Sequence, residues 1–208
     1  RVKNKNLKFL NGKPMISYVI NAAIESNKVK DIYVNSEHNE IGQIAKKYGV
    51  NFYKRDEKLA EDSITSDTFN YDFLKNIECD ILVMVNPVSP LITGNDIDDA
   101  INYYLKNKLD TLISVREEQL QAFCENESIN FNPKEVLPMT QNISPIQLCS
   151  WAICIWNSKV FLQHYEKYGH AVFSGKYGFY KLDKVKSLKI SEPIDFLMAE
   201  IFLKAKKN

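Results

Sequence analysis

Hydrophobic and polar positions alternate between two spacings along the first part of the chain. Apolar residues recur every three or four positions over 15–24, which predicts an amphipathic helix. The segment "DIYVNS" (31–36) then predicts a short strand. Residues 38–50 return to the helical spacing, and Gly49 is suited to end that helix.

Two further apolar runs predict strands. "DILVMVNP" (80–87) is continuous and bounded by turn residues, which is typical of a strand buried on both faces, and "DTLISV" (110–115) is similar. Between them, residues 96–107 have helical spacing, with Thr93 and Asn95 as candidate caps. This alternation predicts an α/β fold with three layers and a mostly parallel sheet.

The later part of the chain follows a different pattern. Residues 116–147 are polar and irregular. Beyond them we predict a strand over 151–156, a helix over 158–168, a strand over 178–182 and a helix over 193–205. A long irregular stretch inside a compact domain is usually a lid or a segment that packs on a partner. We therefore expect a single domain over 1–208, with a lid or dimerisation excursion within about 116–182.

Composition narrows the functional classes. The chain has 45% hydrophobic and 25% charged residues and a formal net charge of +1. A nucleic-acid-binding surface usually gives a basic surplus, so we expect no nucleic-acid partner. We find no apolar run of membrane-spanning length and no secretory signal in these residues, and we expect a cytoplasmic protein without membrane contact.

The four cysteines have no metal-type spacing. They are Cys79, Cys124, Cys149 and Cys154, and three of them stand in apolar or aromatic surroundings. We expect reduced thiols in the core rather than disulfides or a zinc site.

Candidate chemistry follows the predicted strands. In a sheet of this type, ligands bind at the carboxyl ends of the strands. That rule selects "NSEHNE" (35–40), "NPVSPL" (86–91) and the turn before residue 151. Each alone is compatible with an ordinary turn. Together with the basic start of the chain, they favour a site for an anionic small molecule.

The order of motifs resembles a known family. "RVKNKNLKFLNGKPMISYVI" is similar to the segment that follows the Gly-rich phosphate loop in the acylneuraminate and Kdo cytidylyltransferases, the CMP-sugar synthetases. The resemblance continues through "KRDEKLAEDSITS", "ILVMVNPVSPLITGNDIDDAI" and "MTQNISPIQLCSWAICIW" to "SLKISEPIDFLMAE". It implies a Rossmann-like αβα nucleotidyltransferase fold. It also implies transfer of CMP from CTP to a sugar acid with release of pyrophosphate, for surface glycan synthesis.

The resemblance also concerns the start of the chain. The family opens with a central strand and the Gly-rich loop, whereas Arg1 matches the residue directly after that loop. We therefore expect the natural protein to carry this strand upstream of Arg1. A sheet without its central strand would leave two edges unpaired.

The resemblance assigns nucleotide-binding residues. Arg1 and Lys5 would contact the phosphates and act in catalysis, with Asn6 beside them, and Arg55 and Ser66 would hold phosphate and ribose or base. An arginine fork and a lysine point charge suit phosphate. The basic start is also compatible with a solvated surface, and Ser66 by itself predicts a helix cap.

The acceptor motifs depart from the family. Its Gln-Pro-Thr-Ser-Pro-Leu-Arg corresponds to residues 86–92, where Ile92 replaces the arginine. Its Arg-Gln-Asp corresponds to 140–142, and its Asn-Gly-Ala to Ser-Trp-Ala at 150–152. The acceptor-binding residues that the resemblance implies are Asn86, Ser89, Gln141 and Ser150.

The metal motif departs further. In the family, Asp-Ile-Asp before the last helix holds Mg²⁺, an ion that prefers oxygen ligands. The corresponding residues are Lys189 and Ser191, so both carboxylates are replaced. The resemblance thus implies magnesium as a cofactor without assigning its ligands. Lys189 could neutralise phosphate charge in its place, or Glu192 could be a displaced ligand.

Three interpretations remain open. The first is an active cytidylyltransferase acting on CTP and a small-molecule acceptor. The second is a degenerate homologue that binds nucleotide without turnover. The third is a nucleotidyltransferase of the same fold with another base or acceptor. The resemblance also implies a homodimer, in which the excursion helps to close the partner's site.

Overall fold

A four-stranded mixed sheet forms the centre of the molecule. The computed structural model describes residues 5–205. The strand order is β10 (Tyr177–Lys181), β6 (Thr111–Glu118), β9 (Ile146–Asn157) and β5 (Ile81–Val85). β10 pairs parallel to β6, whereas β9 is antiparallel to both of its neighbours. Three of these four strands therefore share one direction, as expected for a mostly parallel mixed sheet.

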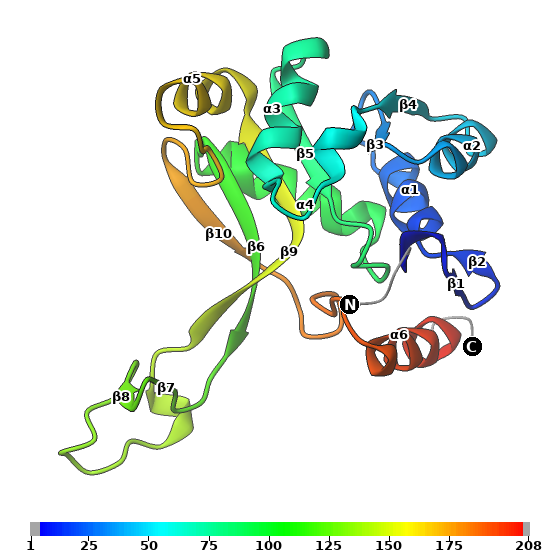
Figure 1. The fold of residues 1–208 in the computed structure, drawn as a ribbon. Helices are drawn as coiled ribbons and strands as arrows, with labels where there is room; N and C mark the ends of the chain where they lie inside the picture. Colours follow the sequence, from blue (N-terminus) through cyan, green and yellow to red (C-terminus); the bar gives the residue numbers. More distant parts are fainter. Residues whose placement is uncertain (1–4, 206–208) are drawn as a thin grey trace.

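Helices cover both faces of this sheet (Figure 1). α1 (Ile16–Glu25) and α4 (Gly94–Lys106) pack together on one face, where Ile97 and Leu112 belong to the same buried cluster. α3 (Ser66–Asn76) and α5 (Ser158–Tyr168) pack together on the other. There, Phe73, Phe161 and Trp156 form a second buried cluster with Ile113. Since Leu112 and Ile113 are consecutive in β6, the alternation of a strand places them on opposite faces.

A second, smaller sheet lies beside the first. β3 (Tyr33–Ser36) and β4 (Asn51–Lys54) pair in parallel and are connected by α2 (Asn39–Lys47). Gly49 has a φ of 70° just after α2, which confirms its predicted role at the end of the helix. No strand within residues 5–205 pairs with the second edge of β3 or with the outer edge of β5.

The expected burial of β5 on both faces is wrong. All five of its residues are only partly buried. The reason is a cavity between β3 and β5, lined by residues of both strands. A continuous apolar run predicts a strand, but the burial of that strand depends on which elements pack beside it.

The long irregular stretch contains an arm (Figure 1). β6 and β9 stay paired as far as Glu118 and Ile146, so β9 is twice as long as the predicted strand. The segment that connects them, residues 119–145, includes β7 (Phe123–Cys124), β8 (Glu127–Ser128) and η3 (Thr140–Asn142). We call this segment, with the outer halves of β6 and β9, the arm. The remainder of the expected excursion, including α5 and β10, packs on the main sheet.

The arm explains why the cysteine prediction is partly wrong. All four thiols are free, as expected, and Cys154 is buried in the core. Cys124 and Cys149 are exposed, because Cys124 lies in β7 and Cys149 in the outer half of β9. Neighbouring apolar residues in sequence do not guarantee burial on an arm that leaves the core.

The two ends of the described chain meet. These elements are η1 (Lys5–Leu7), β1 (Phe9–Leu10), β2 (Lys13–Pro14) and, near the carboxyl end, α6 (Pro193–Ala205). Leu10 of β1 packs with Ala199 of α6 in one buried cluster. None of the helices among residues 5–205 is both long enough and apolar enough to cross a membrane.

Helix starts follow the sequence with one correction. Thr93 caps α4, and the Asp96 carboxylate accepts hydrogen bonds from the Thr93 N–H at 2.7 Å and hydroxyl at 2.6 Å. Ser66 is not the cap of α3: Thr65 takes the cap position and Ser66 is the first helical residue. Adjacent Thr and Ser residues compete for this position, and sequence alone does not decide between them.

Candidate active site at the carboxyl ends of the strands

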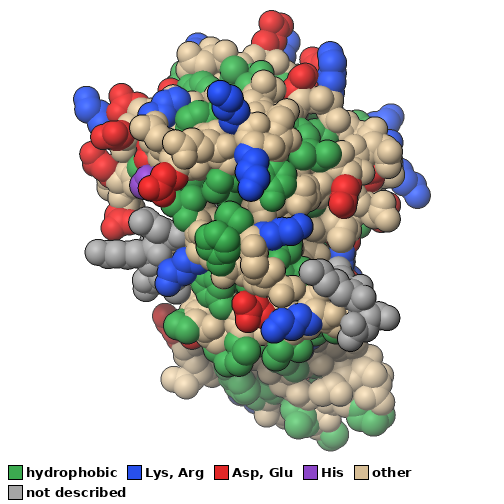
Figure 2. Space-filling view, turned by 90° about the vertical axis from the view of Figure 1, so that its right-hand side faces the viewer, with side chains coloured by type: hydrophobic (Ala, Val, Ile, Leu, Met, Phe, Trp, Pro, Cys, Tyr) green, Lys and Arg blue, Asp and Glu red, His purple; other side chains and the backbone are tan. Residues whose placement is uncertain are grey.

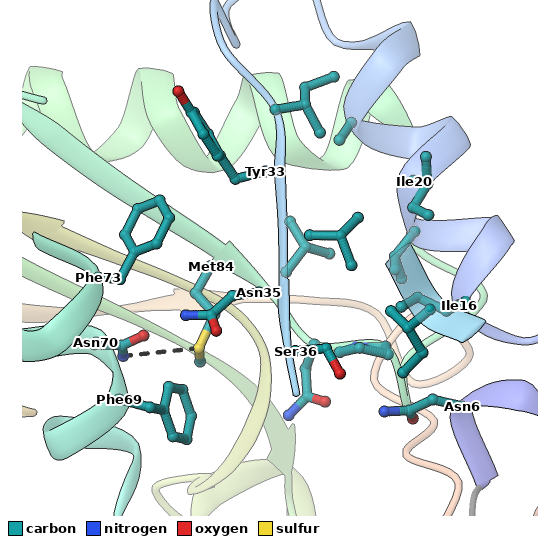
Figure 3. Close-up of a pocket in the computed structure, with 18 of the residues that line it drawn as sticks. Asn6, Ile16, Ile20, Tyr33, Asn35, Ser36, Phe69, Asn70, Phe73 and Met84 are labelled. Atoms are coloured by element: carbon teal, nitrogen blue, oxygen red, sulfur yellow. Dashed lines mark hydrogen bonds between the residues drawn. The ribbon is translucent and has the colours of Figure 1, made fainter. Parts of the chain in front are cut away.

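A cavity of about 640 Å³ joins the two sheets. Its apolar part is enclosed by side chains of α1, β3, β5 and α3. Figure 3 shows Ile16 and Ile20 of α1 on one side of β3, and Phe69 and Phe73 of α3 on the other. This part borders the strand edges of β3 and β5 that no described strand covers.

The polar part of the cavity lies where three strands end. Glu37, Arg55 and Asn86 directly follow the last residues of β3, β4 and β5. This is the edge at which open α/β sheets bind ligands. The charged and polar residues gathered there include Lys5, Asn6, Ser36, Glu37, His38, Arg55, Ser66, Asn86 and Lys189.

The structure brings together part of the predicted site. Lys5, Asn6, Arg55, Ser66 and Asn86 all line this cavity, although they come from four separate segments. Three further predicted residues are not among its described lining: Ser89, Gln141 and Ser150. Arg1 lies outside the described residues.

Arg55 is held by Glu37, which lies in the selected stretch 35–40, although sequence reasoning did not predict this pairing. Its Nε and Nη2 donate to Glu37 Oε2 at 3.0 and 2.6 Å, and both side chains are about 15% exposed. Partial burial alone would raise the pKa of Glu37, but hydrogen bonds from its own backbone and from Arg55, with the charge of Arg55, lower it. The guanidinium also lies over the Phe69 ring, 5.1 Å from its centroid. The position of Glu37 directly after β3 was the available signal.

Lys5 and Asn6 enter the site on η1. Lys5 Nζ donates to the carbonyl of Ile190 at 3.2 Å, which ties the amino end of the described chain to the segment before α6. Asn6 Oδ1 is buried and has no hydrogen-bond partner. A buried acceptor without a partner costs free energy, so such an atom at a cavity is suited to accept from a ligand.

The opposite wall also carries an unpaired amide oxygen. Asn35 Oδ1 is buried without a partner, and in Figure 3 the side chain points towards Asn70 and Met84. Asn70 is nearly fully buried, and its amide contacts Met84 Sδ at 3.9 Å. With Asn6, this gives the cavity two buried amide acceptors on different walls.

Asn86 and Ser89 belong to the turn after β5. Asn86 Oδ1 accepts from the Val88 N–H at 3.3 Å, and the Asn86 carbonyl accepts from the Ser89 N–H at 3.0 Å. Ser89 is fully buried, and its hydroxyl has no hydrogen-bond partner. Gln141 lies on the arm in η3, where its carbonyl accepts from Gln119 at 3.1 Å.

Ser150 stabilises a bulge in β9. The pairing of β6 with β9 shifts so that residues 150–153 lie opposite Ser114 alone. The Ser150 hydroxyl donates to the Ser114 carbonyl at 3.0 Å, and the two hydroxyls are 2.8 Å apart. Ser114 Oγ also accepts from the Ile153 N–H at 2.9 Å. Ser150 is therefore nearly buried and engaged within the sheet.

The bulge places Trp151 in an unusual conformation. Its φ is 57°, in the left-handed region, and the side chain lines the cavity. Bulky residues are rare there, because the Cβ crowds the carbonyl at a cost of about 1–2 kcal/mol. Sequence reasoning missed Trp151, although it stands where the family motif has glycine.

The described residues do not fit a magnesium site built from carboxylates. Lys189 lines the cavity, and its ammonium group would repel a cation. The carboxylate of Asp195 accepts from the N–H groups of Ser191 and Glu192, both at 2.8 Å, at the start of α6. Among residues 5–205, no three His, Cys, Asp or Glu side chains are grouped so that they could hold an ion.

Comparison with curated proteins gives two kinds of relative. The chain is 28% identical over 205 residues to N-acylneuraminate cytidylyltransferase A of Danio rerio, covering 94% of this chain and 46% of that protein. It is 27% identical over 223 residues to post-translational flagellin modification protein B of Campylobacter coli, covering 99% of this chain and 90% of that protein. The chain thus spans about half the length of several curated relatives it matches.

Solved structures share the fold. The structure of CMP:2-keto-3-deoxy-manno-octonic acid synthetase complexed with CTP superposes with a TM-score of 0.72 over 99% of this chain and 94% of the other, at 12% identity. A family model described as Cytidylyltransferase matches residues 1–184. With its mixed sheet, its two helical layers and a polar site where β3, β4 and β5 end, the chain belongs to the cytidylyltransferase family.

Proposed function

We propose that this protein transfers CMP from CTP to a sugar acid and releases pyrophosphate. The observation that carries the proposal is the gathering of Lys5, Arg55 and Lys189, from three separate segments, around one cavity at the carboxyl ends of the strands. The three cations outnumber the two carboxylates on the same lining, Asp31 and Glu37, and this positive balance favours an anion such as a triphosphate. The family membership and the names of the relatives support cytidine as the base and a sugar acid as the acceptor.

The reaction that follows from this proposal is one in-line displacement. An acceptor hydroxyl oxygen forms a bond to the α-phosphorus of CTP and passes its proton to water. The bond between that phosphorus and the bridging oxygen to the β-phosphorus breaks, and pyrophosphate leaves with the electron pair. Catalysis of this type depends on positioning and on stabilising negative charge. Lys5 and Arg1 would supply that charge at the phosphates, and Arg55 and Ser66 would hold the nucleotide.

Acceptor binding is assigned to the turn after β5. Asn86 lines the cavity there and can hydrogen-bond a sugar hydroxyl or carboxylate. The Ser89 hydroxyl, buried without a partner, lies three residues further along the same turn. In this assignment Ser150 acts through the bulge it stabilises, and Gln141 acts from the arm.

Magnesium enters the proposal as a companion of the nucleotide. Because the family's two carboxylates are Lys189 and Ser191 here, we expect the ion to arrive bound to the triphosphate rather than to a protein site. Magnesium alone should then leave the melting temperature unchanged, whereas CTP with magnesium should raise it. An increase with magnesium alone would contradict this part of the proposal.

A homodimer formed through the arm is part of the same proposal. The arm carries exposed apolar side chains, including Val136 at 95% and Leu137 at 62% exposure. Hydrophobic side chains gather at the lower end of the molecule in Figure 2, the height at which the arm lies in Figure 1. Exposed apolar patches of this kind mark interaction sites.

Since a cytidylyltransferase draws on the nucleotide pool, the proposal also supports a cytoplasmic location.

The test is pyrophosphate release by the full chain. CTP, UTP, GTP and ATP are compared, each with magnesium and either N-acetylneuraminic acid, Kdo or a phosphorylated small molecule. We expect turnover with CTP and a sugar acid, and loss of turnover in Lys5→Ala. Turnover with UTP, GTP or ATP instead of CTP would show that the protein uses another base than cytosine. Absence of turnover, while CTP still raises the melting temperature, would support a nucleotide-binding homologue without catalysis.

A further inference from the structure

Trp151 combines a strained backbone with a side chain at the candidate site. Its φ of 57° is one that glycine adopts without steric cost, whereas an indole side chain makes it unfavourable. Residues in such conformations persist where the surrounding structure fixes them, and they concentrate at functional sites. The fold therefore tolerates an aromatic side chain at a position whose backbone favours glycine.

The surroundings fix this conformation firmly. Ser150, on one side of Trp151, is hydrogen-bonded to Ser114, and Ile153, two residues on, donates to the same serine hydroxyl. The carbonyl of Ala152 accepts from the Asn86 N–H at 2.9 Å. One flank of Trp151 is thus attached to β6 and the other to β6 and to the turn after β5.

These attachments place Trp151 beside the turn after β5. The hydrogen bond from Asn86 to the residue next to Trp151 holds the backbone of Trp151 beside the turn that carries the proposed acceptor residues. Trp151, Asn86, Pro87 and Lys189 line the same cavity. Trp151 is partly exposed. The centroid of the Phe173 ring lies 6.1 Å from the centroid of the indole, and the two planes make an angle of 64°. One side is therefore packed, and the side chain still borders the cavity.

We infer that Trp151 is a specificity-determining residue whose indole forms an apolar wall of the acceptor pocket. This inference rests on the proposed function. A tryptophan face packs well on the apolar C–H face of a sugar ring or on the methyl of an N-acyl group. Asn86 and Lys189, on the same cavity, would bind hydroxyl and carboxylate groups. The arrangement favours a sugar acid that carries an N-acyl group over one that lacks it.

Two substitutions at Trp151 and two acceptors test the inference. N-acetylneuraminic acid carries an N-acetyl group, and Kdo does not. We expect Trp151→Gly to raise the KM for N-acetylneuraminic acid about five- to tenfold, the usual weight of one aromatic contact. The KM for Kdo should change less, and the KM for CTP should stay constant. Trp151→Phe should restore part of the preference.

Melting temperatures distinguish a role of Trp151 in specificity from a role in packing alone. Trp151→Gly should lower the melting temperature only moderately, because relief of the backbone strain offsets part of the packing lost against Phe173 and against the buried cluster that contains Phe73. The matched control is Trp156→Phe in the same strand. Trp156 is fully buried in the core, and its Nε1 donates to the Val172 carbonyl at 3.0 Å. This control should lower the melting temperature and leave the ratio of the two acceptor KM values unchanged.

Failure of the inference and failure of the proposed function give different results. If Trp151→Gly lowers turnover equally with both acceptors, or raises the KM for CTP instead, Trp151 does not determine specificity. If the wild type shows no turnover, tryptophan emission is titrated with N-acetylneuraminic acid in the presence of CTP. A saturable change that is absent in Trp151→Phe supports the indole wall without catalysis. No change in the wild type overturns the inference.

Discussion

Arg55 and Glu37 form a two-point pair at the carboxyl ends of β4 and β3, with both guanidinium hydrogen bonds directed at one carboxylate oxygen. The cation assigned to the nucleotide is therefore partly neutralised in this structure. Glu37 fixes the position of Arg55, but its charge opposes an incoming phosphate.

This pair predicts opposite effects of two substitutions on CTP binding. Arg55→Ala should weaken CTP binding about tenfold or more, the usual weight of a charge-assisted hydrogen bond. Glu37→Gln should strengthen it, since an amide can still accept from Arg55 without opposing the phosphate. Isothermal titration with CTP and magnesium measures both. Equal affinity in the wild type and Arg55→Ala would remove Arg55 from the nucleotide site.

The carboxylate of Asp96 predicts a pH dependence of stability. Burial alone would raise its pKa, but hydrogen bonds from Lys186 and Thr93, with the charge of Lys186, lower it below the ordinary 3.8. A group whose pKa is lowered by folding stabilises the folded state above its unfolded pKa. That contribution is lost as the pH falls through the folded value, below 3.8.

Asp96→Asn tests this dependence. The side chain of Lys186 is only 14% exposed, and the substitution leaves its charge without this partner. We expect a loss of about 1–3 kcal/mol in the free energy of unfolding near neutral pH. The difference in stability between Asp96→Asn and the wild type, measured by thermal unfolding, should become smaller below pH 3.8. A difference that stays constant across that range would show that the charge of Asp96 is not what stabilises the fold.

Gly94 predicts a steric effect where α4 approaches α1. A Cβ at this position would lie 2.7 Å from the carbonyl carbon of Glu25 and 2.8 Å from the Ser26 nitrogen. Backbone atoms cannot rotate away, so Gly94→Ala should destabilise the protein by about 1–3 kcal/mol. Asn95→Ala, at the next and exposed position of α4, is the matched control. Chemical denaturation measures both, and equal midpoints would contradict the close approach.

The arm predicts the surface used for assembly. Val136→Asp combined with Leu137→Asp should convert a dimer to a monomer in sedimentation velocity, because it places two charges on an exposed apolar surface. The melting temperature of the monomer's core should change little. Leu105→Asp, which alters a 52% exposed leucine on α4, serves as the control and should leave the assembly intact. A dimer that survives the double substitution would place the interface elsewhere.

The order of helices and strands could be predicted because local signals determine it. Continuous apolar runs identified β5 and β6, and Pro193 marked the start of α6. The short strand β4 was missed, since four residues with little burial give a weak pattern. Resemblance to a family then supplied five of the polar residues that line the cavity, which are Lys5, Asn6, Arg55, Ser66 and Asn86.

The remaining features depend on contacts between distant segments. The Glu37 pair requires the loops after β3 and β4 to meet, and the conformation of Trp151 requires the bulge that Ser114 and Ser150 stabilise. No local pattern encodes either contact. The replacement of a family glycine by Trp151 was the one available sign of a left-handed position.

The unpaired edge of β5 has a consequence for amide hydrogen exchange. In an antiparallel pair, alternate N–H groups point towards the partner strand, so alternate amides of Ile81–Val85 point away from β9 and towards the cavity. Those amides exchange quickly while the cavity holds water, and slowly when an extended backbone pairs with the edge. The difference in amide exchange rate between neighbouring residues of β5 therefore reports whether the two sheets are joined into one.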